Sequence, residues 1–111
     1  MNERLPKSEI LRGRKLISWA FKNSKTLYSD EFVILRVCPY GERKVLFAVE
    51  RKVKGAVKRN RIKRLLREFY RKNKDKFQVG IWIFIGREAL LRIKSHGINF
   101  PLIIPDKGGE G

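Results

Sequence analysis

The sequence predicts an α/β domain in which a small mixed sheet packs on one basic helix. Residues 57–74 have the periodicity of an amphipathic helix, and apolar runs of strand length precede and follow it, at residues 44–51 and 78–85. A strand, a helix and a strand in succession form a crossover unit, which normally makes the two strands parallel. With 111 residues the chain has the length of one domain, residues 1–111, with one core.

The N-terminal part predicts an arm and a short helix. We expect residues 1–12, which are basic and polar, to form an extended arm anchored by Leu11, with a frayed tail as the alternative. Residues 13–23 predict a helix that must dock on another element, because a helix of this length is not stable alone. One side of it is apolar, and Trp19 lies off that side. The apolar side consists of Leu16, Ile17, Ala20 and Phe21.

Two apolar runs, residues 31–37 and 44–51, predict strands, and the turn residues 39–42 between them predict a hairpin. The first run is apolar almost throughout, which is typical of a strand covered on both faces. The single cysteine, Cys38, is expected to be a small hydrophobe at the strand end, since one cysteine excludes an internal disulfide. Alternation along the first strand puts Phe32 and Ile34 on one face and Val33 and Leu35 on the other.

The helix predicted over residues 57–74 has one apolar stripe and one cationic face. Between residues 51 and 76 the chain has 13 Lys or Arg residues but only two acids, so like charges lie on neighbouring turns. A polyanion relieves that repulsion, whereas a helix that is merely solvated normally has interspersed acids. The stripe is formed by Ile62, Leu65, Leu66 and Phe69, and the cationic side by Asn60, Arg64, Arg67 and Arg71, with Arg61 and Lys63 on its flanks.

The overall charge also favours a nucleic-acid partner. The chain has 27 Lys and Arg against 11 Asp and Glu, a formal charge of +16, and such a charge attracts phosphate backbones and anionic membranes alike. No run approaches the roughly 18 apolar residues of a membrane span, and the N-terminus lacks the apolar segment of a secretory signal. We therefore expect a cytoplasmic nucleic-acid-binding protein without a membrane partner, and a solvated basic surface is the alternative.

The sequence shows little sign of catalytic chemistry of its own. Its one histidine, His96, lies in a glycine-containing stretch, and a lone histidine is more often structural than catalytic. The acids are scattered, with Asp30 and Glu31 as the one adjacent pair. No phosphate-binding loop, nucleophile elbow or Cys-x-x-Cys pattern occurs. We expect no catalytic residue and no metal site formed by the protein.

Residues 52–68, KVKGAVKRNRIKRLLRE, resemble the signature of the bacterial ribonuclease P protein subunit family, which lies at a strand-to-helix junction. The match is dense and without gaps. Upstream, the family's spacing is matched at about the positions of Leu11, Phe21 and the pair Phe32 and Val33. Residues 83–87, IFIGR, resemble the family's last strand and the basic residue after it. The resemblance covers roughly residues 4–92.

The resemblance implies a two-layer α/β sandwich similar to the second domain of ribosomal protein S5, with a left-handed crossover where a right-handed one is the default. Relatives usually end in a long amphipathic helix. Here residues 88–94 predict only one or two helical turns, and the remainder, with a flexible tail at residues 105–111, is expected to be irregular. The family's terminal helix is therefore expected to be absent or replaced.

Members of this family bind a large catalytic RNA, and the complex removes the 5′ leader of precursor tRNA by Mg²⁺-dependent hydrolysis with the RNA as catalyst. The resemblance thus implies an endoribonuclease subunit whose partners are ribonuclease P RNA and precursor tRNA, and whose Mg²⁺ is bound mainly through RNA. We expect a monomer in a 1:1 complex with the RNA, although the residues leave the oligomeric state open. A structural RNA-binding protein, such as a ribosomal component, and a nuclease acting alone are the alternatives.

The resemblance implies that the cationic helix face meets the catalytic RNA. Arginine suits this role because its guanidinium group binds phosphate through two parallel hydrogen bonds. Asn60 has a second possible role, as a local cap near the start of the helix. The set expected to bind the RNA subunit is Lys58, Arg59, Asn60, Arg61, Lys63, Arg64, Arg67 and Arg71.

The resemblance also implies a cleft between the first helix and a sheet face that holds the single-stranded leader. Phe21 is expected in this cleft, with the core as its alternative place. Ile17 and Leu35 stand where relatives often place Phe and Tyr. Stacking is therefore weakened there or moved to another aromatic residue, Trp19 or Tyr40. The set expected to bind the leader is Arg12, Ile17, Phe21, Val33, Leu35, Arg51 and Lys52.

Overall fold

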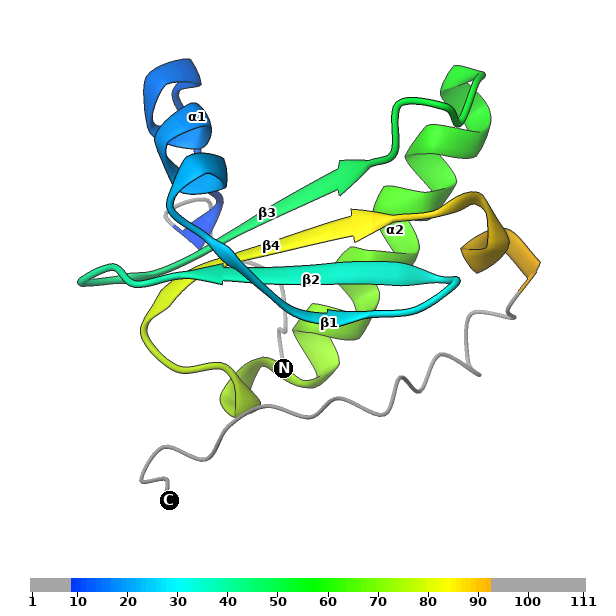
Figure 1. Cartoon of the computed structure of the whole chain (residues 1–111). Helices are drawn as coiled ribbons and strands as arrows, with labels where there is room; N and C mark the ends of the chain where they lie inside the picture. Colours follow the sequence, from blue (N-terminus) through cyan, green and yellow to red (C-terminus); the bar gives the residue numbers. More distant parts are fainter. Residues whose placement is uncertain (1–8, 93–111) are drawn as a thin grey trace.

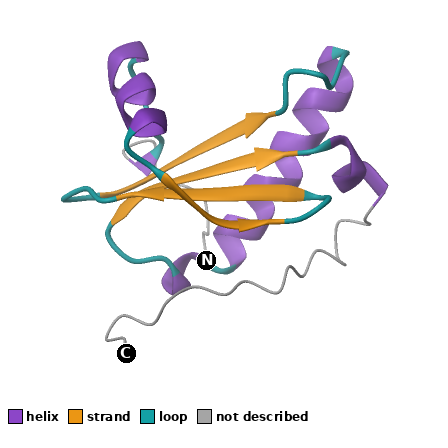
Figure 2. Ribbon diagram, viewed as in Figure 1, coloured by secondary structure: helices purple, strands orange, loops and turns teal. Residues whose placement is uncertain are grey.

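The structure, a computed structural model, describes residues 9–92 of the chain. Its elements are α1 (Arg14–Lys22), β1 (Lys25–Ser29), β2 (Val33–Cys38), β3 (Arg43–Val49), α2 (Ala56–Lys72), the short 3-10 helix η2 (Lys74–Lys76), β4 (Gly80–Gly86) and the 3-10 helix η3 (Glu88–Arg92). The four strands form one sheet, α2 covers one of its faces, and α1 packs on the other (Figure 1). Figure 2 shows the same arrangement coloured by secondary structure.

The predicted crossover is confirmed. The strand order β1-β2-β4-β3 makes β3 and β4 neighbours, although α2 separates them in sequence. They run parallel, from Arg43 opposite Gly80 to Val49 opposite Gly86. In Figure 1 both arrows point to the right, β3 lies above β4, and α2 lies behind the sheet. The connection is therefore left-handed, as the resemblance implies.

The predicted hairpin between β2 and β3 is wrong. β4 lies between these two strands and pairs antiparallel with β2, from Val33 opposite Gly86 to Cys38 opposite Ile81. β4 is the most apolar strand, GIWIFIG, and nearly all of its residues are buried. Such a strand needs neighbours and cover on both sides, which the middle of the sheet provides. The turn at residues 39–42 still reverses the chain, but the strands that it joins flank β4.

The sequence interpretation missed β1. This strand, KTLYS, is exposed at both ends, and only Leu27 and Tyr28 are partly buried. It pairs antiparallel with β2 at the edge of the sheet, with an irregularity in register between Thr26 and Tyr28. A polar edge strand lacks the continuous apolar run that marks a buried strand. The true hairpin is therefore β1–β2, formed by the weakest strand pattern in the chain.

The two faces of the sheet have separate cores. The predicted anchor Leu11 is confirmed, because it is 3% exposed and its amide donates to the carbonyl oxygen of Val45 at 2.8 Å. The thiol of Cys38 is buried, and burial raises its pKa. The α1-side core consists of Leu11, Ala20, Cys38, Ile81 and Ile83. The α2-side core contains Ile62, Leu65, Leu66, Phe69 and Tyr70 of α2, packed on strand residues such as Val33, Leu35, Phe47 and Phe84.

Gly86 allows α2 to lie close to the sheet. A Cβ atom at this position would lie 2.2 Å from Cγ2 of Ile62 and 3.2 Å from Cδ1 of Leu66. Real side chains do not approach so closely, so any residue other than glycine would push the helix away. The predicted stripe thus meets the sheet at a position that accepts only a hydrogen atom as a side chain.

Both helices lie within two residues of their predicted ranges, and η3 is the helical turn predicted after the third apolar run. Predictions for the first eight residues and for residues 93–111, including the tail and the replacement of the terminal helix, lie outside the described residues. In the part of the chain that the structure describes, no helix has both the length and the apolar character needed to cross a membrane.

Candidate nucleic-acid interface

The outward face of α2 carries a row of exposed arginines. Arg61 and Arg64 are exposed, and their side chains have no hydrogen-bond or ion-pair partner among residues 9–92. Arg67 is exposed as well, and its guanidinium carbon lies 5.7 Å from the centre of the Phe47 ring. This contact steadies the side chain but leaves its donors available. We call Arg61, Arg64 and Arg67 the arginine surface.

Arg59 points the other way. Its Nη1 donates to the carbonyl oxygens of Glu50 and Val53, at 3.0 and 2.8 Å. Its Nη2 donates to the carbonyl oxygen of Val49 at 3.3 Å. On a helical wheel Arg59 lies about 60° from Ile62, at the edge of the buried stripe. The structure therefore corrects the prediction that this guanidinium is offered to RNA, since it closes the turn between β3 and α2 instead.

Other cations of the predicted set have acidic partners on the protein. Lys58 pairs with Glu88 at 3.1 Å, and Arg71 pairs with Glu68 at 3.0 Å. The hydrogen bond from Arg71 is the main reason why the pKa of Glu68 is lowered. These pairs lie at the surface, where ion pairs are weak, so a phosphate can replace the carboxylate. The rest of the set is Asn60, exposed and without a side-chain hydrogen bond among the described residues, and half-buried Lys63.

Arg51 and Lys52 lie in the turn between β3 and α2, and both are exposed. The turn is held from inside, because Val53 is 1% exposed and its amide donates to the carbonyl oxygen of Glu50 at 3.1 Å. The Glu50 carboxylate in turn binds Nε of Arg87 at 3.1 Å. The two predicted leader-binding cations therefore project from a fixed turn next to the start of α2.

The other predicted leader residues on the α1 side all keep some exposed surface. Ile17 and Phe21 are half-buried on α1, where both pack against the α1-side core. Arg12 is exposed just before α1 begins. Phe21 thus contributes to a core and also keeps part of its surface, which is compatible with both of the roles expected for it.

Val33 and Leu35 do not lie in a cleft. Each is 1% exposed and belongs to the α2-side core. The prediction that the leader contacts the sheet face bearing them is wrong, because α2 covers that face. Alternation along β2 puts Ile34 and Arg36, both half-buried, on the α1 side instead. The resemblance to the family implied Leu35 as the leader-binding residue of β2, whereas the structure places its neighbour Ile34 on the α1 side.

Arg36 is a residue of the α1 side that the sequence analysis missed. Its Nε donates to Oγ of Ser24 at 2.7 Å, and its Nη1 donates to Oγ1 of Thr26 at 2.9 Å. Its Nη2 donates to the carbonyl oxygen of Ser24 at 2.9 Å. The side chain thus ties the segment after α1 to β2 and fixes where α1 lies over the sheet. The signal in the sequence was one cation inside an otherwise apolar strand.

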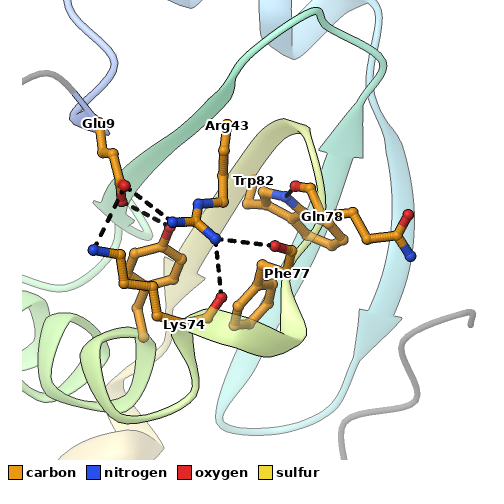
Figure 3. Close-up of polar contacts among 7 residues, drawn as sticks. Glu9, Arg43, Lys74, Phe77, Gln78 and Trp82 are labelled. Atoms are coloured by element: carbon orange, nitrogen blue, oxygen red, sulfur yellow. Dashed lines mark hydrogen bonds and ion pairs between the residues drawn. The ribbon is translucent and has the colours of Figure 1, made fainter. Parts of the chain in front are cut away.

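A second charged cluster is structural. Glu9 binds Nη2 of Arg43 at 3.0 Å and Nζ of Lys74 at 3.5 Å (Figure 3). The hydroxyl of Tyr70 donates to the other carboxylate oxygen at 3.2 Å. Burial alone raises the pKa of Glu9, but the hydrogen bond and the charge of Arg43, with the charge of Lys74, outweigh it and leave the pKa lowered. The cluster joins the segment before α1 to β3 and to the end of α2.

The exposed cations of the arginine surface are suited to bind a polyanion. Among residues 9–92 no group of three or more His, Cys, Asp or Glu side chains is placed to hold a metal ion. Several acids are engaged with cations of the protein itself, as Glu9, Glu50 and Glu68 are.

The fold and the arginine surface together define a small α/β nucleic-acid-binding protein. Its basic helix follows a parallel crossover strand and turns its outward face to solvent. The chain belongs to the ribonuclease P family, whose model matches residues 5–99. This confirms the resemblance and favours it over a ribosomal or other structural RNA-binding protein.

Named relatives cover most of the chain. A ribonuclease P protein component of Coprothermobacter proteolyticus is 34% identical over 86 residues, which are 78% of this chain and 71% of that one. One of Petrotoga mobilis is 37% identical over 99 residues, 87% of this chain and 83% of that one. The RNase P protein of Thermotoga maritima superposes with a TM-score of 0.62 at 31% identity, over 79% of this chain and 86% of that one. That of Staphylococcus aureus, at 19% identity and a TM-score of 0.68, shares the fold over 81% of this chain and 84% of that one.

Proposed function

We propose that this chain is the protein subunit of a ribonuclease P holoenzyme. In this role it binds ribonuclease P RNA and the 5′ leader of precursor tRNA, one protein to one RNA, and assists removal of the leader. Membership in the ribonuclease P family supports the class of enzyme. The relatives named above are themselves called ribonuclease P protein components. In this proposal the RNA supplies the catalyst and the protein supplies binding groups.

The arginine surface is the observation that carries this proposal. Arg61, Arg64 and Arg67 lie on one side of a single helix, and six residues of helix span about 9 Å along its axis. Long arginine side chains on one side of a helix can reach neighbouring phosphates, and each guanidinium binds a phosphate through parallel hydrogen bonds. RNA helices are recognised mainly through backbone and shape rather than base edges. A row of unpaired arginines suits that kind of recognition.

The leader is proposed to bind on the α1 side of the sheet. Single-stranded RNA binds where cations track its backbone and aromatic or apolar side chains contact its bases. Ile17 and Phe21 supply apolar surface there, and Ile34 replaces Leu35 as the β2 residue on that side. Arg12, Arg51 and Lys52 are exposed cations available to leader phosphates.

Mg²⁺ is proposed to be bound mainly through RNA. The protein then acts on the Mg²⁺ requirement indirectly, because a chain with a formal charge of +16 screens the repulsion between phosphates of the catalytic RNA and of the substrate. Less Mg²⁺ is needed for the same screening when the protein is present.

Reconstitution with a bacterial ribonuclease P RNA tests the proposal. Cleavage of a precursor tRNA is measured over a Mg²⁺ titration with and without the protein, and the protein is also assayed alone. We expect the protein to lower the Mg²⁺ concentration needed for half-maximal cleavage and to show no cleavage by itself. An unchanged Mg²⁺ requirement contradicts the assisting role, and cleavage by RNA-free protein favours the alternative of a nuclease acting alone.

A further inference from the structure

Trp19 is exposed, whereas nearly all large apolar side chains among residues 9–92 are buried or half-buried. It is 43% exposed, whereas the other tryptophan, Trp82, is 4% exposed. Among residues 9–92 it is the one aromatic side chain in the group of exposed large hydrophobic residues. The core does not account for this exposure, and Trp19 is one of the two aromatic residues to which stacking of the leader is expected to move.

Tyr40 lies beside Trp19 and comes from a distant part of the chain. The two ring centres are 6.1 Å apart, and the ring planes are inclined by 55°. Tyr40 belongs to the connection between β2 and β3, is half-buried, and packs against the α1-side core. At this angle the rings do not cover each other face to face, and the indole keeps an exposed surface. We call this pair, Trp19 and Tyr40, the wedge.

The backbone that carries Trp19 is fixed. Its carbonyl oxygen accepts hydrogen bonds from the backbone amide and the side-chain amide of Asn23, at 3.0 and 2.8 Å. The next residue, Ala20, is fully buried against the sheet. A base that stacks on this indole therefore meets a ring whose helix is already ordered, which reduces the entropy cost of binding.

The surroundings of Trp19 on α1 are cationic. Lys15 and Lys22 stand four residues before it and three residues after it, which places both beside it on the helix surface. Both are exposed, and α1 contains no acidic residue. An aromatic surface flanked by lysines matches a base flanked by phosphates, whereas an uncharged apolar partner would leave the lysines unused.

The wedge is distinct from the position of Phe21. On a helical wheel centred on the buried Ala20, Trp19 lies about 100° to one side and Phe21 about 100° to the other. A nucleotide on Trp19 is therefore a different one from any that contacts Phe21. Both residues belong to α1, which packs on the sheet face opposite α2, the side proposed for the leader.

We propose that Trp19 and Tyr40 form a stacking site for one unpaired base of the 5′ leader, with Lys15 and Lys22 contacting the phosphates next to it. The proposal rests on the proposed function, because that function supplies the single-stranded RNA. The site is expected to accept any base, since every base has a face to stack. Stacking of one base on an aromatic side chain typically changes affinity by about 5- to 150-fold.

The test uses the reconstituted holoenzyme and two precursor tRNAs, with leaders of about one and about ten nucleotides. We expect Trp19→Ala to weaken binding of the long-leader substrate by at least about 5-fold and to leave the short-leader substrate unchanged. Trp19→Phe keeps an aromatic face and should retain most of the affinity. Val79→Ala, at an exposed apolar position that is 61% exposed and outside the α1 side, is the matched control and should change neither substrate.

Each outcome decides between the two proposals. If the wild-type holoenzyme binds the long leader more tightly and Trp19→Ala preserves that preference, the stacking site is wrong and the proposed function stands. An equal loss for both substrates assigns Trp19 to the tRNA body or to the catalytic RNA and overturns the leader assignment. If the wild-type protein improves neither binding nor cleavage, the proposed function itself is wrong.

Fluorescence of the free protein gives a readout that a folding defect does not imitate. An unstructured RNA of about ten nucleotides should quench the emission of exposed Trp19 in a saturable manner. Trp19→Phe retains buried Trp82 as its tryptophan and should show no such quenching while its spectrum reports an intact core. Equal quenching in the two proteins would overturn the stacking site.

Discussion

The two faces of the sheet differ in how completely they are covered. On the α2 side, β2 contributes Val33 and Leu35, which are each 1% exposed. On the α1 side the same strand contributes Ile34 and Arg36, which are only half-buried, before it ends at the buried Cys38. The α2 side is therefore a closed core that stabilises the fold, and the α1 side keeps surface that a ligand can cover. One strand serves both tasks because its side chains alternate.

The same division occurs within α2. Arg59 and Arg64 are one residue type in one helix, five positions apart. Arg59 donates to three carbonyl oxygens of the turn between β3 and α2, whereas Arg64 has no polar partner among the described residues. Position on the helical wheel, and not residue type, therefore decides whether an arginine stabilises the protein or is available to RNA.

The largest difference between the two faces should appear at neighbouring positions of β2. Leu35→Ala should lower the free energy of unfolding by about 4 kcal/mol, because it leaves a cavity in the closed core. Ile34→Ala should lower it by about 1 kcal/mol, since that side chain is only half-buried. Urea denaturation followed by circular dichroism measures both. Similar losses for the two variants would show that the α1 side is as closed as the α2 side.

The arginines of α2 provide the next test. Arg59→Ala should cost about 2 kcal/mol of unfolding free energy, because three carbonyl oxygens lose a charged donor. The double variant Arg64→Ala/Arg67→Ala should leave stability nearly unchanged. It should instead weaken binding to ribonuclease P RNA and reduce the slope of log K against log salt concentration by roughly 2.

A matched control is available for the double variant. Lys25 and Lys76 are exposed cations outside α2, so Lys25→Ala/Lys76→Ala removes the same charge from other places. We expect that control to leave the slope nearly unchanged. An equal reduction in both variants would mean that overall charge, and not the arginine surface, governs RNA binding.

Much of the fold was predictable because it depends on local periodicity. The stripe of Ile62, Leu65, Leu66 and Phe69 and the apolar run of β4 are strong patterns, and the crossover follows from their order. The pairing of strands was not predictable in the same way. Adjacency in sequence favoured a β2–β3 hairpin, but the insertion of β4 depends on which strand most needs cover on both faces, a property of the assembled sheet.

The candidate site was also predictable only where it depends on local periodicity. The outward direction of Arg61, Arg64 and Arg67 follows from the wheel, and the structure agrees. The carbonyl partners of Arg59 lie in a turn, so the sequence does not show that they converge on one guanidinium. The wedge is also a tertiary feature, since Trp19 and Tyr40 lie 21 positions apart and meet only once α1 docks on the sheet.

The smallest expected effect concerns pH and the edge of the closed core. Glu9 contacts Arg43, Lys74 and Tyr70, and its pKa is lowered in the folded protein. Its stabilising contribution is therefore complete above the usual glutamate pKa of about 4.3 and is lost as the pH falls through the lower folded value. Glu9→Gln should reduce the free energy of unfolding at pH 7 by about 1 kcal/mol and flatten the decline of stability between about pH 5 and pH 3.

The matched control is Glu88→Gln, which removes a more exposed carboxylate, paired with Lys58, and should change that decline of stability little. The measurement is the denaturant midpoint of each protein as a function of pH over this range. If the midpoints of wild type and Glu9→Gln fall in parallel, the cluster holds the segment before α1 without linkage to protonation of Glu9.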